Sequence, residues 1–495
     1  MYTLSPETIK YADSLAVSKY GIPEITLMRN AAKFCFDYIL TLISKGDRIV
    51  IVCGKGNNGG DGYELATLLK KAGFDTCAIN VFDSVPNTET AKTVFNECEA
   101  VFPSFEWKNK ICQADVIIDA LFGVGFYGSI EEDSKIGKLI LACNESNALK
   151  IAVDTPSGIN SADGRVGSIV FRADHTITMA YAKTGMLSYP AREYCGKIAI
   201  ADIGYPDELC NEIPKDALVA DDGYVKSLIH ERQSNTHKGC FGRLLMYCGS
   251  ENMTGAGVLA ANGALRTGCG LVNIANTKEV INKLQAHLTE PVFSVLEDDK
   301  YESQLIELCG KATAVLCGCG LGVSDIKKQH IISLIKNADC NIIFDADGIN
   351  MLCGNTLILK EARKTPILTP HPLEFARLTE TSTDTIQKDR INLAKEFSQK
   401  HGCVLVLKGA STVIASPDGR LAINTSGNPG LAKGGSGDVL AGIISSFCAQ
   451  GLPAFESAVL GVYLHGKAAD ILKEEISEYG LLPSDLPMAV AKLLP

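Results

Sequence analysis

Gly434-Gly435-Ser436-Gly437-Asp438 is followed directly by the apolar run Val439-Leu440-Ala441-Gly442-Ile443-Ile444. Small residues let several backbone N–H groups approach one point, and the start of a helix adds positive partial charge there. This combination predicts a phosphate site at the start of a helix. Asp438 falls in the first turn, where a carboxylate would hinder plain anion binding. It therefore indicates a base that takes a proton from a hydroxyl attacking phosphorus. The alternative is that Asp438 only caps the helix and the glycines form a tight turn.

The overall composition is typical of a soluble globular protein with two or three domains. The chain has 495 residues, of which 46% are hydrophobic and 21% charged. A net charge of -10 argues against nucleic acid as a partner. We find neither a signal peptide nor an apolar run of the roughly 18 residues that a membrane helix needs. The N-terminus predicts instead a helix that starts with Ser5 as its cap and Pro6 in its first turn.

The cysteines indicate a reducing compartment. There are 18, but they are scattered and none forms a Cys-x-x-Cys pair. Buried free thiols in a reducing cytosol are the simplest interpretation, so we expect a cytoplasmic protein. Separately, we expect a homo-oligomer.

The first half contains a strand, a glycine loop and a helix in succession. Residues 48–53 are a β-branched run, residues 54–62 are rich in glycine, and residues 64–71 have a helical pattern. Gly54, Gly56 and Gly59 satisfy G-x-G-x-x-G, which by itself is a weak dinucleotide signal. Asp61 brings a negative charge to the same place and argues against a simple pyrophosphate site. The loop is better suited to a mixed ligand, such as a hydroxylated group with a cation.

Polar side chains recur where predicted parallel strands of this half end. Asn58, Asp119, Asp154 and Ser157 all follow such strands. Ligands of parallel α/β sheets gather beyond the carboxyl ends of the strands, and these oxygens suit a hard cation. The alternative is that each acid caps a turn or a helix.

The second half also alternates strands with helical stretches, so we expect a second parallel α/β domain after a boundary near residue 215. His371 lies between two prolines at a strand end, and this rigid setting predicts a ring that points into the cleft. Lys408 follows another strand and could meet a nucleotide phosphate, although a surface lysine is the ordinary alternative.

Both halves resemble known families. The first, residues 1–215, resembles the NAD(P)H-hydrate epimerase domain through residues 56–62, 119–125 and 154–158. The second, residues 216–495, is similar to the ribokinase-like NAD(P)H-hydrate dehydratase domain. Its marks here are His237-Lys-Gly, Gly320-Leu-Gly322, Asp345-Ala-Asp347, Thr-Pro-His371-Pro, Lys408-Gly-Ala and the Gly434–Asp438 stretch. Leu373, Cys319 and Arg29 stand where the family pattern has a glycine, a proline and an acid.

The resemblance implies an α/β protein of two domains, a Rossmann-like three-layer domain followed by a ribokinase-like domain. It also implies repair of the hydrated cofactors NADHX and NADPHX. The first domain would interconvert the R and S forms at C6 of the nicotinamide ring. The second would phosphorylate the C6 hydroxyl of the S form with ADP or ATP and Mg²⁺, so that phosphate departs and NAD(P)H is restored.

Site residues follow from the same resemblance. Asp154 and Asp438 would be catalytic, and K⁺ would bind Asn58, Asp119 and Ser157. The substrate would also contact Asn57, Asn58, Gly59, Gly60, Asp61, Gly123, Val124, Gly125, Phe126, Tyr127, Gly128, Ser129, Ala256, Gly322 and His371. The nucleotide would contact Lys408, Gly409, Ala410, Ser411, Thr412, Gly435, Ser436 and Gly437.

Rival functions remain open at this stage. The nearest is a ribokinase-like kinase of a vitamin alcohol, fused to a nucleotide-binding domain, that leaves the phosphate on its product. A non-catalytic nucleotide sensor or scaffold would not require Asp61, Asp119, Asp154 and Asp438. Asp61 likewise argues against a dehydrogenase built on the first glycine loop.

Overall fold

The computed structural model describes residues 1–229 and 231–495. Its contacts divide the chain into two compact units, Tyr2–Ala217 and Leu218–Pro495, with Met1 belonging to the second. The boundary expected near residue 215 lies close to this division. Across the residues described, no helix is both long and apolar enough to cross a membrane.

The first unit is built on one sheet whose strands, in the order β4-β3-β2-β5-β6-β7-β8, all run parallel. The strands are β2 (Arg48–Cys53), β3 (Asp75–Asn80), β4 (Val101–Pro103), β5 (Val116–Ala120), β6 (Leu149–Val153), β7 (His175–Met179) and β8 (Lys197–Ala201). The helices are α1 (Pro6–Ser18), α2 (Glu24–Ile39), α3 (Asn57–Lys71), α4 (Glu89–Glu97), α5 (Trp107–Gln113), α6 (Lys135–Glu145) and α7 (Asp207–Glu212).

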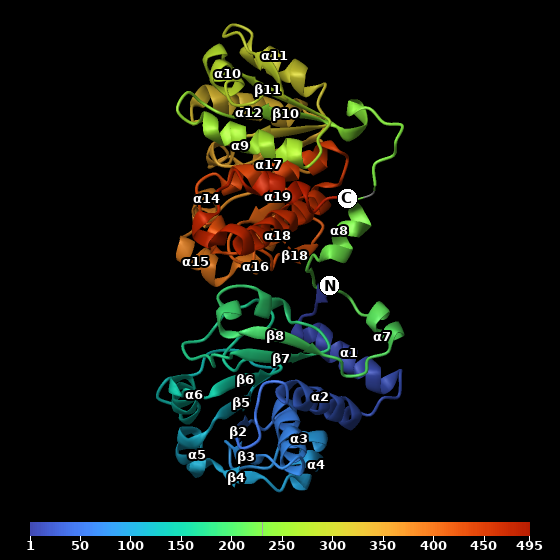
Figure 1. Cartoon of the computed structure of the whole chain (residues 1–495), viewed down its shortest axis with the longest axis vertical. Coiled ribbons are helices and arrows are strands. Elements are labelled where there is room, and N and C mark those ends of the chain that lie inside the picture. The colour runs from blue at the N-terminus through green and yellow to red at the C-terminus, as the bar shows by residue number, and fades with distance from the viewer. Residues whose placement is uncertain (230) are drawn as a thin grey trace. The chain divides into compact units, whose positions relative to one another are not determined.

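Helices cover both faces of this sheet. Alternate residues of β2 point to opposite sides, so Ile49 and Ile51 pack against α1–α4 while Val50 and Val52 pack against α5 and α6. Figure 1 shows α3 and α4 on one side of the strands and α5 and α6 on the other. The Rossmann-like three-layer prediction is therefore confirmed. Ser5 caps α1 by accepting the N–H of Thr8, and Pro6 is the first helical residue, as predicted.

The glycine loop differs from expectation, because α3 begins at Asn57 and includes residues 57–62. Its glycines allow close packing. A Cβ atom on Gly59 would lie 2.0 Å from the carbonyl oxygen of Gly54, and one on Gly62 would lie 2.7 Å from the Cβ of Ala120. Only glycine lets the helix approach the strand ends this closely, so these residues serve helix–sheet contact rather than loop flexibility.

The second unit has a larger sheet, ordered β18-β17-β16-β15-β14-β13-β10-β11-β12, with β9 pairing at the β18 edge. The strands are β10 (Arg243–Tyr247), β11 (Leu271–Asn276), β12 (Val292–Val295), β13 (Ala314–Cys317), β14 (Asn341–Phe344), β15 (Ile367–Leu368), β16 (Val404–Leu407), β17 (Val413–Ala415) and β18 (Leu421–Ile423). Two further short strands of the chain are β1 (Tyr2–Thr3) and β9 (Ala217–Leu218).

The strands from β12 to β16 are parallel, as predicted, but β17 and β18 are antiparallel. The expectation of a purely parallel sheet was therefore wrong at this edge. The connection between β16 and β17 spans residues 408–412, which is too short for the helical crossover that parallel neighbours need.

Helices flank the second sheet and share a large apolar core, in which α9 and α17 pack together. They are α8 (Asp222–Leu228), α9 (Thr254–Arg266), α10 (Lys278–Gln285), α11 (Tyr301–Cys309), α12 (Asp325–Asn337), α13 (Asp347–Asn350), α14 (Pro372–Thr379), α15 (Thr383–Lys388), α16 (Arg390–His401), α17 (Ser436–Ala449), α18 (Ala454–Gly480) and α19 (Leu486–Ala491).

Candidate active sites

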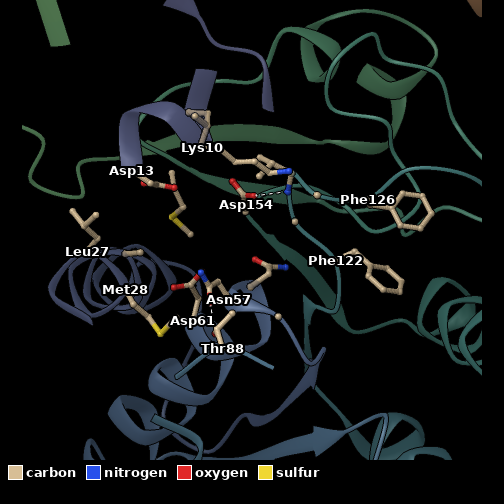
Figure 2. Close-up of a pocket in the computed structure, with 18 of the residues that line it drawn as sticks. Lys10, Asp13, Leu27, Met28, Asn57, Asp61, Thr88, Phe122, Phe126 and Asp154 are labelled. Carbon is tan, nitrogen blue, oxygen red and sulfur yellow. Dashed lines mark hydrogen bonds between the residues drawn. The ribbon is translucent and has the colours of Figure 1, made fainter. Parts of the chain in front are cut away.

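The first unit holds a cavity of about 580 Å³ beyond the carboxyl ends of its central strands. Residues of α1 and α2 line one side of it, and the start of α3 and the loop after β5 line the others. Figure 2 shows three aspartates around this space, Asp13, Asp61 and Asp154. Two aromatic side chains, Phe122 and Phe126, lie toward one end of it. This is the place where ligands of parallel α/β sheets bind.

Asp154 follows β6 and is held from three directions. Its backbone has φ 67°, a left-handed conformation that is uncommon outside glycine, and its N–H donates to the carbonyl of Ile177 at 2.7 Å. One carboxylate oxygen, Oδ2, accepts the N–H of Val124 at 3.0 Å. The other oxygen lies 2.6 Å from the ammonium of Lys183. The carboxylate therefore has a fixed orientation at the cavity.

Lys183 is a site residue that the sequence analysis missed. Its side chain is 0% exposed and also donates to Thr178 Oγ1 at 2.8 Å and to the carbonyl of Met179 at 3.0 Å. A buried lysine needs such partners, because burial of an unpaired charge is costly. Lys183 stands four residues after the end of β7, a strand that the sequence analysis did not identify, so the search of strand ends did not reach it.

Two other carboxyl groups of the cavity lining, those of Asp61 and Asp13, have raised pKa values. Burial raises the pKa of Asp61 well above its ordinary value, and the charges of Asp154 and Asp13 add to the effect. Burial likewise raises the pKa of Asp13, which accepts a hydrogen bond from Tyr205. Crowding of carboxyl groups around a single buried ammonium favours protonation of some of them.

The three residues predicted to bind a cation lie at adjoining strand ends. Asp119 is fully buried, and its carboxylate accepts the N–H and the hydroxyl of Ser157, both at 2.8 Å. Burial raises the pKa of Asp119 to about 6. The side-chain oxygen and nitrogen of Asn58 are buried without a hydrogen-bond partner among the described residues. An unpartnered amide oxygen and a buried carboxylate are a donor set that fits a hard cation such as K⁺.

The substrate residues predicted for the first unit fall into two groups, those that line the cavity and those that do not. Those that line the cavity are Asn57, Asn58, Asp61, Gly123, Val124, Gly125, Phe126, Tyr127 and Asp154. Gly59 and Gly60 are buried inside α3, and Gly128 and Ser129 are also outside the lining. Besides Lys183, the sequence analysis missed residues of α1 and α2, such as Asp13 and Glu24. These two helices precede β2, so their residues do not follow a predicted strand and could not be found from strand ends.

In the second unit, Asp438 lies in the first turn of α17. The N-cap is Gly435, whose left-handed backbone (φ 104°) starts the helix, so Asp438 is not the cap. Burial raises the pKa of Asp438 to about 6; the charge of Asp345 adds to this, and Cys319 and Lys408 oppose it. The alternative in which Asp438 only caps the helix therefore does not hold.

Lys408 is paired at this site rather than free on the surface. Its ammonium lies 2.8 Å from Oδ1 of Asp345, which also accepts the hydroxyl of Thr369 at 2.6 Å. Burial lowers the pKa of Lys408, but the charges of Asp345 and Glu374 outweigh it and leave the pKa raised. A Cβ atom on Gly437 would lie 3.1 Å from the ammonium, so the lysine lies beside the glycine stretch.

His371 also has a structural role that was not predicted, as the N-cap of α14. Its Nδ1 accepts the N–H groups of Leu373 and Glu374 and so caps α14, and Nε2 lies 3.4 Å from Glu374 Oε1. The ring is thus held by a helix start, with nearly half of the side chain exposed. Burial lowers the pKa of His371, and the positive charge of Lys408 contributes to this shift.

The remaining predicted residues of this unit lie around the same strand ends. The N–H of Gly322 donates to Asp347 at 2.7 Å, and a Cβ atom on Gly320 would lie 2.7 Å from Ala256. The segment predicted to contact the nucleotide, Gly409, Ala410, Ser411 and Thr412, follows β16 and Lys408. Arg390, also missed, is almost fully buried and donates to the carbonyls of Leu407 and Lys408 at the base of this segment. The hydroxyl of Ser436 is buried without a partner in the part of the chain described.

Both units match known families. Residues 244–492 match the family described as NAD(P)H-hydrate dehydratase, and residues 24–185 match the YjeF-related protein N-terminus.

Full-length relatives and a solved structure agree with these matches. The bifunctional NAD(P)H-hydrate repair enzyme Nnr of Thermofilum pendens is 34% identical, over 98% of this chain and 95% of its own length. The enzyme of the same name from Escherichia coli is 33% identical, over 97% and 93%. The ADP/ATP-dependent NAD(P)H-hydrate dehydratase of Bacillus subtilis, co-crystallised with ATP/Mg²⁺, is 33% identical with a TM-score of 0.51, covering 55% of this chain and 96% of its own. The chain belongs to the family of bifunctional NAD(P)H-hydrate repair enzymes.

Proposed function

We propose that this chain repairs hydrated NADH and NADPH in two reactions, epimerisation in the first unit and nucleotide-driven dehydration in the second. One observation carries the proposal most directly. Each unit holds one of the two predicted catalytic carboxylates, and each carboxylate lies close to a buried lysine. Asp154 lies at the end of a parallel strand, and Asp438 lies at the start of a helix. Asp154 pairs with Lys183, and Asp438 lies by Asp345 and Lys408. The full-length similarity to repair enzymes supports the same pairing of activities.

In the dehydration, Asp438 takes the proton of the C6 hydroxyl on the S form of the hydrate. The hydroxyl oxygen then bonds to the terminal phosphorus of ADP or ATP, and the bond from that phosphorus to the nucleotide breaks. The backbone N–H groups of Gly435–Gly437 and the ammonium of Lys408 stabilise the charge on the transferred group. Phosphate leaves C6 as the ring nitrogen supplies electrons, and loss of a proton from C5 then restores the double bond of NAD(P)H. Mg²⁺ bound to the nucleotide would neutralise part of its phosphate charge.

In the epimerisation, a bond at C6 must break and form again on the other face of the ring. Asp154 is our candidate acid/base, because its carboxylate faces the cavity and its orientation is fixed by Val124 and Lys183. Lys183 holds one oxygen of this carboxylate in an ion pair, and Asp61 and Asp13 are the neighbouring groups whose raised pKa values favour the protonated form.

We also propose that Asn58, Asp119 and Ser157 hold K⁺ in the first unit. The unpartnered amide of Asn58 and the buried carboxylate of Asp119 support this site. A bound K⁺ would supply positive charge beside the substrate cavity. The homo-oligomer and the cytoplasmic location stay predictions.

One incubation tests the main proposal. The protein is mixed with R and S NADH hydrate and either ADP or ATP, while the returning nicotinamide absorbance and free phosphate are recorded together. We expect one phosphate per NADH restored and consumption of both forms. A stable phosphorylated product without phosphate release would favour the vitamin-alcohol kinase instead, and no reaction would reject both.

A further inference from the structure

A thiol and two carboxylates face one another at the centre of the second unit. Cys319 lies in the turn after β13, Asp345 directly follows β14, and Asp438 lies in the first turn of α17. One potential ligand atom from each lies within 4.8 Å of the other two. Cys319 is fully buried, and its thiol donates to Oδ2 of Asp345 at 3.7 Å. The cysteine thus belongs to the apolar core but directs its thiol at a carboxylate of this group.

The ion pair of Lys408 does not occupy the atoms that would bind a cation. Lys408 contacts Oδ1 of Asp345, while Cys319 faces Oδ2, so an ion bound at Oδ2 would not displace the lysine. The three potential ligand atoms lie within 4.8 Å of one another, so a single ion could be shared among them.

The chemistry of the donors selects the kind of ion. Magnesium prefers oxygen ligands only and keeps several waters, whereas one sulfur and two oxygens with an open fourth position suit Zn²⁺. Mg²⁺ that enters with a nucleotide would therefore not compete effectively for the cysteine sulfur.

We infer that Zn²⁺ binds Cys319, Asp345 and Asp438 and inhibits the dehydration that we propose for this unit. On binding, the thiol proton is released to solvent and a metal–sulfur bond forms, with no change of oxidation state. The ion engages the carboxylate of Asp438, which can then no longer accept the substrate proton. The epimerase site is built from other residues, so its activity stays unchanged and serves as an internal reference.

Direct binding is tested without any assay of activity. The full-length protein is stripped of metals with a chelator and titrated with Co²⁺, a spectroscopic substitute for Zn²⁺. We expect thiolate-to-cobalt charge-transfer absorption in the wild type and its loss in Cys319→Ser. Cys240→Ser is the matched control, because Cys240 is an exposed cysteine of the same unit. The same absorption in Cys319→Ser, or its absence in the wild type, would overturn the inference.

Inhibition is then measured at constant ADP or ATP and Mg²⁺, with each variant compared with its own rate in the absence of zinc. Cys319→Ser should need at least about tenfold more Zn²⁺ for half-inhibition than the wild type and Cys240→Ser, because it lacks a ligand. Equal sensitivity would overturn the inference, since zinc would then act through the nucleotide or another site. Cys319→Ala is a second variant should the serine protein fail to fold. Absence of any dehydration would reject the proposed function, and the cobalt titration would still decide the metal site.

Discussion

The ammonium of Lys183 lies 2.6 Å from the Asp154 carboxylate, and both side chains are buried at the edge of the epimerase cavity. Removal of one partner from a buried ion pair leaves an unpaired charge, which costs about 3–5 kcal/mol. The pair therefore links the stability of the first unit to the orientation of its candidate acid/base.

The first prediction concerns Lys183→Met. Without the ammonium, the Asp154 carboxylate loses a contact that fixes its orientation, so the epimerase rate should fall by about 100-fold or more. Dehydration of the pure S form should be unchanged. Separate assays with R and S hydrate measure this, and urea unfolding measures the loss of stability. The double variant Asp154→Asn/Lys183→Met contains no unpaired charge at this place. It should recover stability but not epimerase activity; recovery of both would contradict a role for the pair in catalysis.

The second prediction concerns Asp154→Asn, which removes the acid/base and keeps the shape of the side chain. R-to-S exchange should fall by at least about 100-fold, while ADP- or ATP-driven repair of the S form continues. Exchange is followed by chromatography of the two hydrates. Exchange at the wild-type rate would remove Asp154 from its proposed role.

The third prediction concerns Asp438 and pH. Because burial places the pKa of Asp438 at about 6, the carboxylate is protonated below this pH and cannot act as a base. Dehydration of the S form should therefore rise with pH through about 6 and then level off. Asp438→Asn should abolish dehydration at every pH and leave the epimerase intact. A rate that does not change between pH 5 and 7 would argue against Asp438 as the base.

The fourth prediction concerns K⁺ and Asp119. The pKa of Asp119 is raised to about 6 in the folded protein, so folding takes up a proton, and the stability that this group contributes is lost as pH rises toward 6. A cation favours the ionised carboxylate. K⁺ should therefore raise the melting temperature of the first unit more at pH 7.5 than at pH 5.

The control for the potassium experiment is Asp119→Asn, in which the pH dependence of the K⁺ effect should disappear. Li⁺ at equal ionic strength separates binding from screening. An identical rise in melting temperature with both ions would contradict a site for K⁺.

The sequence predicted those features of the fold that follow from the ends of strands and from patterns of neighbouring residues. The prediction of two α/β units is confirmed. The roles of Asp154, Asp438 and Lys408, which lie just after apolar strands or at a helix start, stay predictions. The sequence did not predict that α3 starts at Asn57, because glycine suggests a turn unless its packing partner is known. Arg390 and Asp13 were missed because they lie on helices, where only the fold brings them to a site. His371 was expected to serve the cleft, but the adjacent helix start engages its Nδ1.

The left-handed backbone at Asp154 affects how this position should be studied. Asparagine and glycine adopt that conformation readily, whereas alanine and leucine meet steric resistance. A library of all substitutions at residue 154 would thus produce two different rankings. Every substitution without a carboxylate leaves Lys183 unpaired, so differences in the yield of soluble protein among these variants would report backbone preference, and turnover would report the presence of a carboxylate. Alanine, the customary choice for scanning, would confound the two effects, and asparagine separates them.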